Sequence, residues 1–302
     1  MHIVPGRRRL PRITLFGAAI AAGLLLAVVI DVARTGGLGP WLTRHRLPAP
    51  YLAAGERIDI GGRSLYLDCR GRGTPTVILE AGSGSDSGTW RAVHDELATT
   101  SRTCAYDRAG RGRSDPRRRH TLADAAADLR ALLANADEPG PFVFVGHSLG
   151  GAYGRVFAAA YHGEVVGLAL VDAFNPDLQE ARIHPLLGPL RIEYDANLDG
   201  LRAHVTSVDS LDWTTSEMQL RASTPVVAGL PVEVIVAPRY EPRLDEPTNA
   251  AIADAWLAAF ESLSPGRVTH TTAWGAGHEV QLDRPDVVIA SVRRLVDAAR
   301  TD

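Results

Sequence analysis

The pentapeptide Gly-His-Ser-Leu-Gly at 146–150 constrains the fold more than any other part of this sequence. It follows a nearly continuous apolar run at 141–145, which is typical of a strand buried on both faces of a parallel sheet. The Ala- and Gly-rich stretch 149–161 comes next and predicts a helix. A serine placed between such a strand and helix, with glycines beside it, lies on a sharp turn that exposes its hydroxyl. We therefore predict a strand-turn-helix unit with Ser148 at the bend, in the position of a nucleophile.

Strand-like and helix-like segments alternate on both sides of this unit. Gly61-Gly62 separates the first two strand-like runs and predicts a hairpin, so the sheet starts antiparallel. The predicted strands are 56–60, 64–69, 76–79, 102–106, 141–145, 165–171, 231–237 and 267–273. The predicted helices are 90–98, 122–133, 149–161, 249–261 and 285–299. The alternation indicates an α/β fold with a mostly parallel eight-stranded sheet and helices on both faces.

The segment 173–230 interrupts the alternation. It contains short helical patterns, Pro and Asp, but no strand-like run. We interpret it as a helical lid inserted between strands six and seven. Its apolar side chains favour an apolar acyl or ester group as substrate; they include Leu186, Leu187, Leu190 and Trp213.

The N-terminus has the pattern of a membrane anchor or signal. Arg7, Arg8, Arg9 and Arg12 precede an uncharged apolar run at 13–30, about 18 residues and near the lower limit for a membrane-spanning helix. Positive charge before the run favours export of the chain beyond it. Because no convincing small-residue cleavage site comes after the run, we expect an uncleaved anchor; a cleaved signal or a buried helix remains open.

The expected organisation is a basic segment with anchor or signal at 1–34, a linker rich in Gly, Pro and Arg at 35–50, and a catalytic domain at 51–302. We therefore predict membrane association through the N-terminal helix and an exported catalytic domain, with secretion after cleavage as the alternative. The net charge of −3 is small and gives no reason to expect a nucleic-acid partner. We find no metal-ligand cluster, phosphate loop or cofactor signature, and expect a small-molecule substrate without a cofactor.

A serine nucleophile needs a base to accept its proton. His278 ends the sequence Gly-Ala-Gly-His at 275–278, a loop between the last predicted strand and the last predicted helix. From there its ring can reach the carboxyl edge of the sheet, so we select it from the ten histidines. His147 adjoins Ser148, but we expect its side chain to point away and to be structural.

The base in turn needs a carboxylate, which must lie between the serine and the histidine in chain order. Asp172 ends the sixth predicted strand and is our preferred acid, while Glu241 in the turn after the seventh is the alternative. The developing oxyanion needs N–H donors. We assign these to Leu149 and, in the Gly/Ser loop after the third strand, to Ser83.

Four motifs in this order resemble the α/β-hydrolase superfamily, in particular its members with a lid. They are Leu-Glu-Ala-Gly-Ser-Gly at 79–84, Tyr-Asp-Arg-Ala-Gly-Arg-Gly-Arg-Ser at 106–114, Gly-His-Ser-Leu-Gly-Gly at 146–151, and the segment from Gly277-His278 to Pro285. The oxyanion loop of the family often begins His-Gly, where this chain has Ala81-Gly82. Most members of the superfamily carry the acid after strand seven, whereas lipases and some dehalogenases carry it after strand six. An acid at Asp172 matches the second arrangement.

The resemblance also implies a relation between the two cysteines. The family's strand order places the second and fourth strands side by side, which would bring Cys69 and Cys104 onto adjacent strands. If their registers agree, a disulfide can form in an exported domain. The alternative is two separate small buried side chains.

The function expected from these residues is a serine hydrolase, an esterase acting on a carboxylic ester or related acyl bond through an acyl-enzyme. Serine at the bend argues against the dehalogenases and epoxide hydrolases of the superfamily, which use aspartate there. The alternatives are an acyltransferase or perhydrolase, an amidase or peptidase, and a non-catalytic binding protein that kept the fold.

Overall fold

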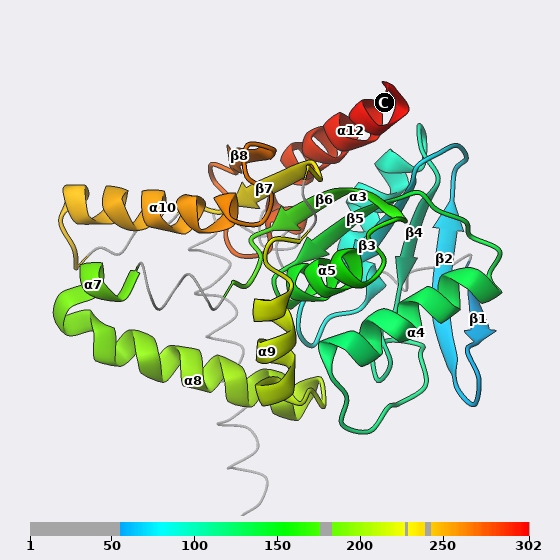
Figure 1. Cartoon of the computed structure of the whole chain (residues 1–302), viewed down its shortest axis with the longest axis horizontal. Helices are drawn as coiled ribbons and strands as arrows, with labels where there is room; N and C mark the ends of the chain where they lie inside the picture. Colours follow the sequence, from blue (N-terminus) through cyan, green and yellow to red (C-terminus); the bar gives the residue numbers. More distant parts are fainter. Residues whose placement is uncertain (1–54, 176–182, 227–228, 239–242, 302) are drawn as a thin grey trace, which may run out of the picture. The chain divides into compact units, whose positions relative to one another are not determined.

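The computed structural model describes residues 55–175, 183–226, 229–238 and 243–301. Eight strands form one sheet in the order β1-β2-β4-β3-β5-β6-β7-β8 (Figure 1). The strand β2 pairs antiparallel with β1 and with β4, and all the other pairs are parallel. The predicted mostly parallel sheet with an antiparallel start is confirmed.

The strand bounds follow the predicted runs closely. They are β1 Glu56–Asp59, β2 Ser64–Arg70, β3 Thr76–Glu80, β4 Thr103–Tyr106, β5 Phe142–His147, β6 Val165–Val171, β7 Val232–Val236 and β8 Val268–Thr272. In the buried β5 strand, side chains alternate between two apolar clusters, since Phe142 and Phe144 belong to one and Val143 and Val145 to the other. A strand buried on both faces therefore reads as an unbroken apolar run.

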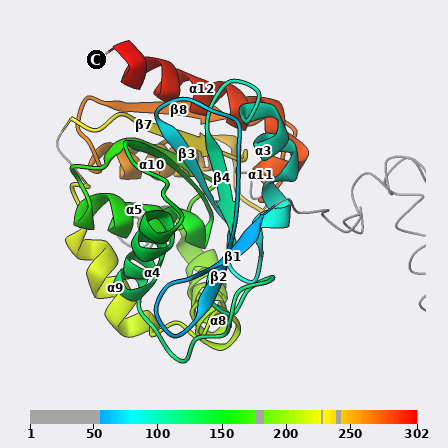
Figure 2. The ribbon, with the colours of Figure 1, turned by 90° about the vertical axis from the view of Figure 1, so that its right-hand side faces the viewer.

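Helices cover both faces of the sheet (Figure 2). On one face lie α4 (Leu122–Asn135) and α5 (Leu149–Ala160), which pack against each other. On the other lie α3 (Arg91–Leu97), preceded by the short helix η1 (Ser87–Trp90), and α12 (Pro285–Thr301), preceded by α11 (Val280–Asp283). The two layers match the predicted helix positions.

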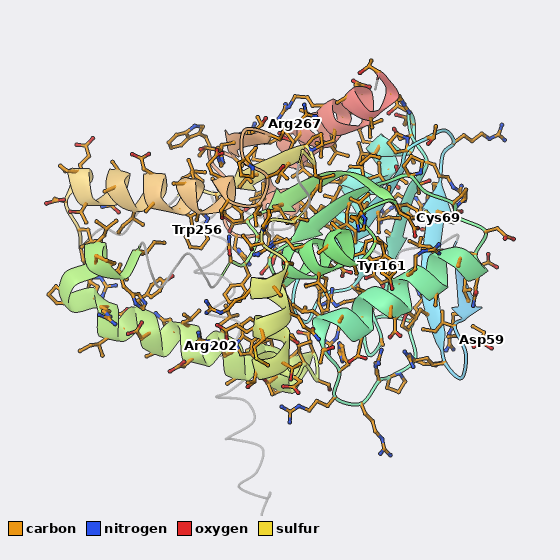
Figure 3. The ribbon with its side chains drawn as sticks, viewed as in Figure 1. Asp59, Cys69, Tyr161, Arg202, Trp256 and Arg267 are labelled. Carbon is orange, nitrogen blue, oxygen red and sulfur yellow. A yellow bond between two sulfur atoms is a disulfide. The ribbon has the colours of Figure 1, made fainter. Side chains whose placement is uncertain are left out.

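The segment between β6 and β7 is helical, as predicted. We call its described residues 183–226 the lid. It contains α7 (His184–Leu187), η3 (Gly188–Leu190), α8 (Arg191–Val208) and α9 (Trp213–Ala222). After β7 comes α10 (Glu246–Glu261), which begins three residues before the predicted start because Asp245 caps it by accepting from the Thr248 N–H. Figure 3 labels Arg202 on α8 and Trp256 on α10.

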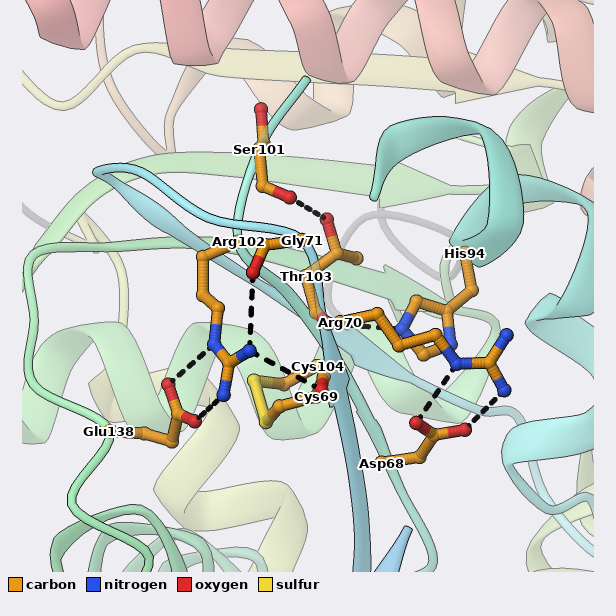
Figure 4. The surroundings of a disulfide bond; sticks show 10 residues. All are labelled: Asp68, Cys69, Arg70, Gly71, His94, Ser101, Arg102, Thr103, Cys104 and Glu138. Atoms are coloured by element: carbon orange, nitrogen blue, oxygen red, sulfur yellow. Dashed lines mark hydrogen bonds and ion pairs between the residues drawn. A yellow bond between two sulfur atoms is a disulfide. The ribbon is translucent and has the colours of Figure 1, made fainter. Parts of the chain in front are cut away.

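A disulfide joins Cys69 of β2 to Cys104 of β4 (Figure 4). The two residues stand opposite each other in the antiparallel register, which the family's strand order implied. The alternative of two separate thiols is therefore wrong. Arg102 lies beside the bridge, where it donates to the carbonyl oxygens of Cys69 and Gly71 at 3.3 and 3.2 Å and pairs with Glu138.

The expected anchor or signal at 1–34 and linker at 35–50 lie outside the described residues. Among the helices in the described ranges, none has both the length and the apolar character needed to cross a bilayer.

Candidate active site

Ser148 stands at the bend between β5 and α5, as the sequence predicts. Its backbone has φ 50° and ψ −119°, a conformation that non-glycine residues rarely adopt. Hydrogen bonds hold the bend: the Ser148 N–H donates to Val171 O at 3.0 Å, and its carbonyl accepts from Gly151 and Phe174 at 3.0 and 3.1 Å. The neighbouring strand and helix thus impose the strained conformation that turns this side chain out of the sheet.

The glycines of the pentapeptide are required by close backbone approach. A Cβ on Gly146 would lie 2.4 Å from the carbonyl oxygen of Gly150. One on Gly150 would lie 2.4 Å from the carbonyl oxygen of Glu80, at the end of β3. Any side chain at these two positions would force the strand-turn-helix unit apart.

His278 and Asp172 form a direct pair. The His278 Nδ1 lies 2.7 Å from Asp172 Oδ2, although 106 residues separate them in sequence. Asp172 directly follows β6 and His278 lies between β8 and α11, so both occupy the carboxyl edge of the sheet. A carboxylate only accepts, so it holds the imidazole with its proton on Nδ1 and leaves Nε2 as the free acceptor.

The environments of the two partners differ. The Asp172 side chain is fully buried, and its Oδ1 accepts from the Ala237 N–H at 3.1 Å. Its backbone has φ 41°, held by donation of its N–H to Ile235 O at 2.7 Å. The His278 side chain is 53% exposed, which leaves its ring open to an approaching molecule. A fixed buried acid below an accessible imidazole is the arrangement that a general base needs.

His147 differs from the expectation that it points away. Its buried ring packs on that of His278, with centroids 4.7 Å apart, and its Nε2 donates to the His278 carbonyl oxygen at 2.9 Å. Burial lowers the pKa of His147, while the nearby Glu279 carboxylate opposes the shift. The sequence carried no periodic signal for this contact, because it depends on how the 275–278 loop folds back over the bend.

Two backbone N–H groups near Ser148 have no acceptor within the described part of the chain. Leu149 is the first residue of α5, and the first N–H groups of a helix lack an intrahelical partner. The Ser83 N–H is likewise without an acceptor there. A Cβ on Gly82, the residue before it, would lie 3.4 Å from Ser148 Cβ, so this loop runs directly beside the serine.

The predicted residues therefore gather at one edge of the sheet. Asp172 and His278 are in contact, while Ser148 joins them through its neighbour His147. No hydrogen bond links the Ser148 hydroxyl to His278 among the described residues, and such bonds often form only when substrate binds. The alternative acid Glu241 lies outside the described residues.

Potential metal ligands occur at the same place. His147, His278 and Glu279 bring ligand atoms within 4.8 Å of one another, and His147 Nδ1 lies 3.8 Å from Glu279 Oε2. The Asp172 carboxylate already occupies the His278 Nδ1. The group is thus part of the candidate active site.

Comparison with known proteins agrees with this fold. A stretch of an uncharacterized protein from Schizosaccharomyces pombe is 42% identical over 82 residues, which is 27% of this chain and 15% of that protein. The chain thus spans only a small part of that relative's length. The solved structure of Cfl2 from Burkholderia cenocepacia superimposes with a TM-score of 0.59 at 23% identity, covering 80% of this chain and 95% of Cfl2.

A thermophilic esterase from Thermogutta terrifontis superimposes with a TM-score of 0.53 at 20% identity, covering 82% of this chain and 99% of the esterase. At these identities the likeness concerns the fold. The model of the alpha/beta hydrolase family matches residues 77–291, well over half of the chain. The chain therefore belongs to the alpha/beta hydrolase family.

Proposed function

We propose that this protein is a serine hydrolase that cleaves a carboxylic ester or related acyl bond through an acyl-enzyme. The observation that carries the proposal is the pair of His278 and buried Asp172 at 2.7 Å, beside a serine held in a left-handed bend. Membership of the hydrolase family supports it. Serine at the bend, where an aspartate would be needed for epoxide or haloalkane chemistry, favours acyl transfer.

The proposed reaction has two halves. His278 Nε2 takes the proton of Ser148 as its Oγ attacks the carbonyl carbon, and the N–H groups of Leu149 and Ser83 donate to the oxyanion. The protonated His278 then gives its proton to the leaving alcohol as the acyl-oxygen bond breaks. In the second half, water gives a proton to His278, attacks the acyl carbon, and releases the acid as Ser148 regains its proton.

Asp172 supports both halves by stabilising the imidazolium that forms each time. Its full burial keeps water from competing for the Nδ1 proton. The Ala237 N–H fixes its other oxygen, so the carboxylate cannot rotate away. These contacts support Asp172 as the acid, in preference to Glu241.

An apolar acyl group is the substrate part that the lid favours. Phe174 donates its N–H to Ser148 O, and its ring lies 5.3 Å from that of Trp213 in the lid. The pair thus joins the lid, through aromatic packing, to the residue whose backbone supports the bend at Ser148. We further propose that the domain works outside the reducing cytosol, supported by the Cys69–Cys104 disulfide.

The test compares the wild type with Ser148→Ala. A fluorophosphonate probe should label the wild type at Ser148, and nitrophenyl esters of increasing acyl length should be hydrolysed. Ser148→Ala should lose labelling and about 10⁴-fold or more of turnover, since members of a triad act as a unit. Ser207→Ala on the lid is the matched control, because that exposed hydroxyl only donates to His204 O within its own helix. Retention of most esterase activity by Ser148→Ala would contradict the proposal.

A further inference from the structure

A buried arginine holds the loop that carries the Ser83 N–H. Arg108 is the second residue after β4, and only 4% of its side chain is exposed. Its guanidinium pairs with the Glu80 carboxylate, donates to the Ala81 carbonyl, and donates to the Gly82 carbonyl at 2.7 Å. Arg108 therefore binds three consecutive residues at the end of β3.

This contact sets the direction of the Ser83 N–H. The peptide bond between Gly82 and Ser83 is trans, so its carbonyl and its N–H point in opposite directions. Because the Gly82 carbonyl faces Arg108, the Ser83 N–H faces away from Arg108. Gly82 itself lies against Ser148, so the orientation of this one peptide decides whether a donor is available to the reacting carbonyl.

A lid residue completes the arrangement. Asp209 directly follows α8, is 5% exposed, and accepts from the Ser83 hydroxyl. Its other oxygen lies 3.4 Å from the Gly84 N–H and 3.2 Å from the Arg108 guanidinium. Asp209 thus binds the loop on the C-terminal side of the Gly82–Ser83 peptide. It also binds Arg108, which holds the loop on the N-terminal side of that peptide.

We propose that Asp209 is a positioning residue of the oxyanion hole: through the Ser83 hydroxyl and Arg108, the lid holds the Ser83 N–H in the orientation that accepts the oxyanion. The inference rests on the proposed function. Buried ion networks contribute little net stability compared with apolar packing. The network here joins two segments 126 residues apart in a loop that runs beside the candidate nucleophile, where geometry matters most.

The lid has other attachments that do not reach this loop. The His120 N–H donates to Ser210 O at 3.1 Å, and the Asp212 N–H donates to His120 O at 2.7 Å. The Asp212 carboxylate pairs with Arg119 and caps α9. Asp212 is therefore a matched control, an aspartate three residues away that pairs with an arginine and secures the lid without contacting the oxyanion loop.

The experiment measures Asp209→Asn, Ser83→Ala and Asp212→Asn in the full chain. Removal of a whole oxyanion donor costs about 10²- to 10³-fold in kcat, so a misdirected donor should cost about 10- to 100-fold. We expect that loss in kcat for Asp209→Asn, with KM changed less than about threefold, and Asp212→Asn within about twofold of the wild type. Affinity for a trifluoromethyl ketone, which places an oxyanion in the hole after addition to serine, should fall in parallel with kcat.

A double-mutant cycle isolates the contact. If Asp209 acts through the Ser83 hydroxyl, the double variant should lose less than the product of the two single losses. Ser83→Ala removes only a hydroxyl, so it tests the contact even if Asp209→Asn is poorly folded. A wild type that the fluorophosphonate does not label would overturn the proposed function. A labelled wild type with Asp209→Asn and Ser83→Ala equal to Asp212→Asn in kcat and ketone affinity would overturn this inference alone.

Discussion

The Nε2 of His147 donates to the backbone carbonyl of His278 across 2.9 Å, so the residue beside the candidate nucleophile holds the loop of the candidate base. The two rings also pack at 4.7 Å. One side chain therefore links the bend after β5 to the loop after β8.

We expect His147→Phe to lower kcat/KM by about fivefold. Phe keeps the ring contact but removes the donor, and one such hydrogen bond contributes about 1 kcal/mol. The measurement is ester hydrolysis, with thermal unfolding as a check on folding. His162→Phe, at an exposed position just after α5, should leave the rate unchanged. Equal activity in the two variants would show that the loop does not need this contact.

The choice of acid can be decided by two amide substitutions. Asp172→Asn should lower kcat by about 10⁴-fold, because an amide can donate to Nδ1 and so stabilise the wrong tautomer of His278. Glu241→Gln should change kcat by less than about twofold. Steady-state kinetics on one nitrophenyl ester compares them. The reverse order of effects would assign the acid to Glu241.

The disulfide should contribute measurably to stability. It closes a loop with a sequence separation of 35, for which the chain-entropy estimate is about 3–4 kcal/mol. We expect the free energy of unfolding of the variant with both Cys69→Ser and Cys104→Ser to be lower by that amount, and its denaturant midpoint to fall with it. Reducing agent should destabilise the wild type and leave the variant unaffected. A variant as stable as the oxidised wild type would contradict the estimate.

Stability should fall in mildly acidic solution because of buried histidines. Burial lowers the pKa of His94, whose Nε2 donates to Thr103 O at 2.9 Å. Below the unfolded pKa of about 6.5, the unfolded chain therefore takes up a proton that the native chain does not. The contribution of His94 to the free energy of unfolding is thus complete above that pH and is lost as the pH falls toward the native pKa. The pKa values of His120 and His147 shift in the same direction for the same reason.

The measurement is the free energy of unfolding at pH 7.5 and at pH 5.5. His94→Gln keeps a donor toward Thr103 but cannot titrate, so its loss between the two pH values should be smaller than that of the wild type. His162→Gln, which alters an exposed histidine, should keep the full loss. Identical losses in all three proteins would remove His94 from the explanation.

The sheet could be predicted from the sequence because its strands are short runs bounded by turn residues, and the central ones are almost entirely apolar. The run at 142–145 shows why, since both faces of β5 are buried and its four side chains there are all apolar. The site residues could be predicted for a related reason. The carboxyl ends of parallel strands meet at one edge, so Ser148, Asp172 and His278 had to converge once the strand order was known.

The supporting contacts could not be predicted in the same way. Arg108 and Asp209 are 101 residues apart, and neither lies in a periodic pattern that indicates its partner. The orientation of His147 depends on the path of a short loop rather than on the alternation of a strand. A charged residue inside a motif, such as Arg108 in the turn after β4, was the one available sign of a buried network.

The position of Asp172 has a consequence for recombining this protein with its relatives. Asp172 lies just before the inserted helices, and the N–H of Phe174, two residues further along the chain, donates to the Ser148 carbonyl. A foreign insert with its junction before Phe174 would replace either the acid or the residue whose N–H supports the bend. Chimaeras that exchange substrate preference therefore need their upstream junction beyond that phenylalanine.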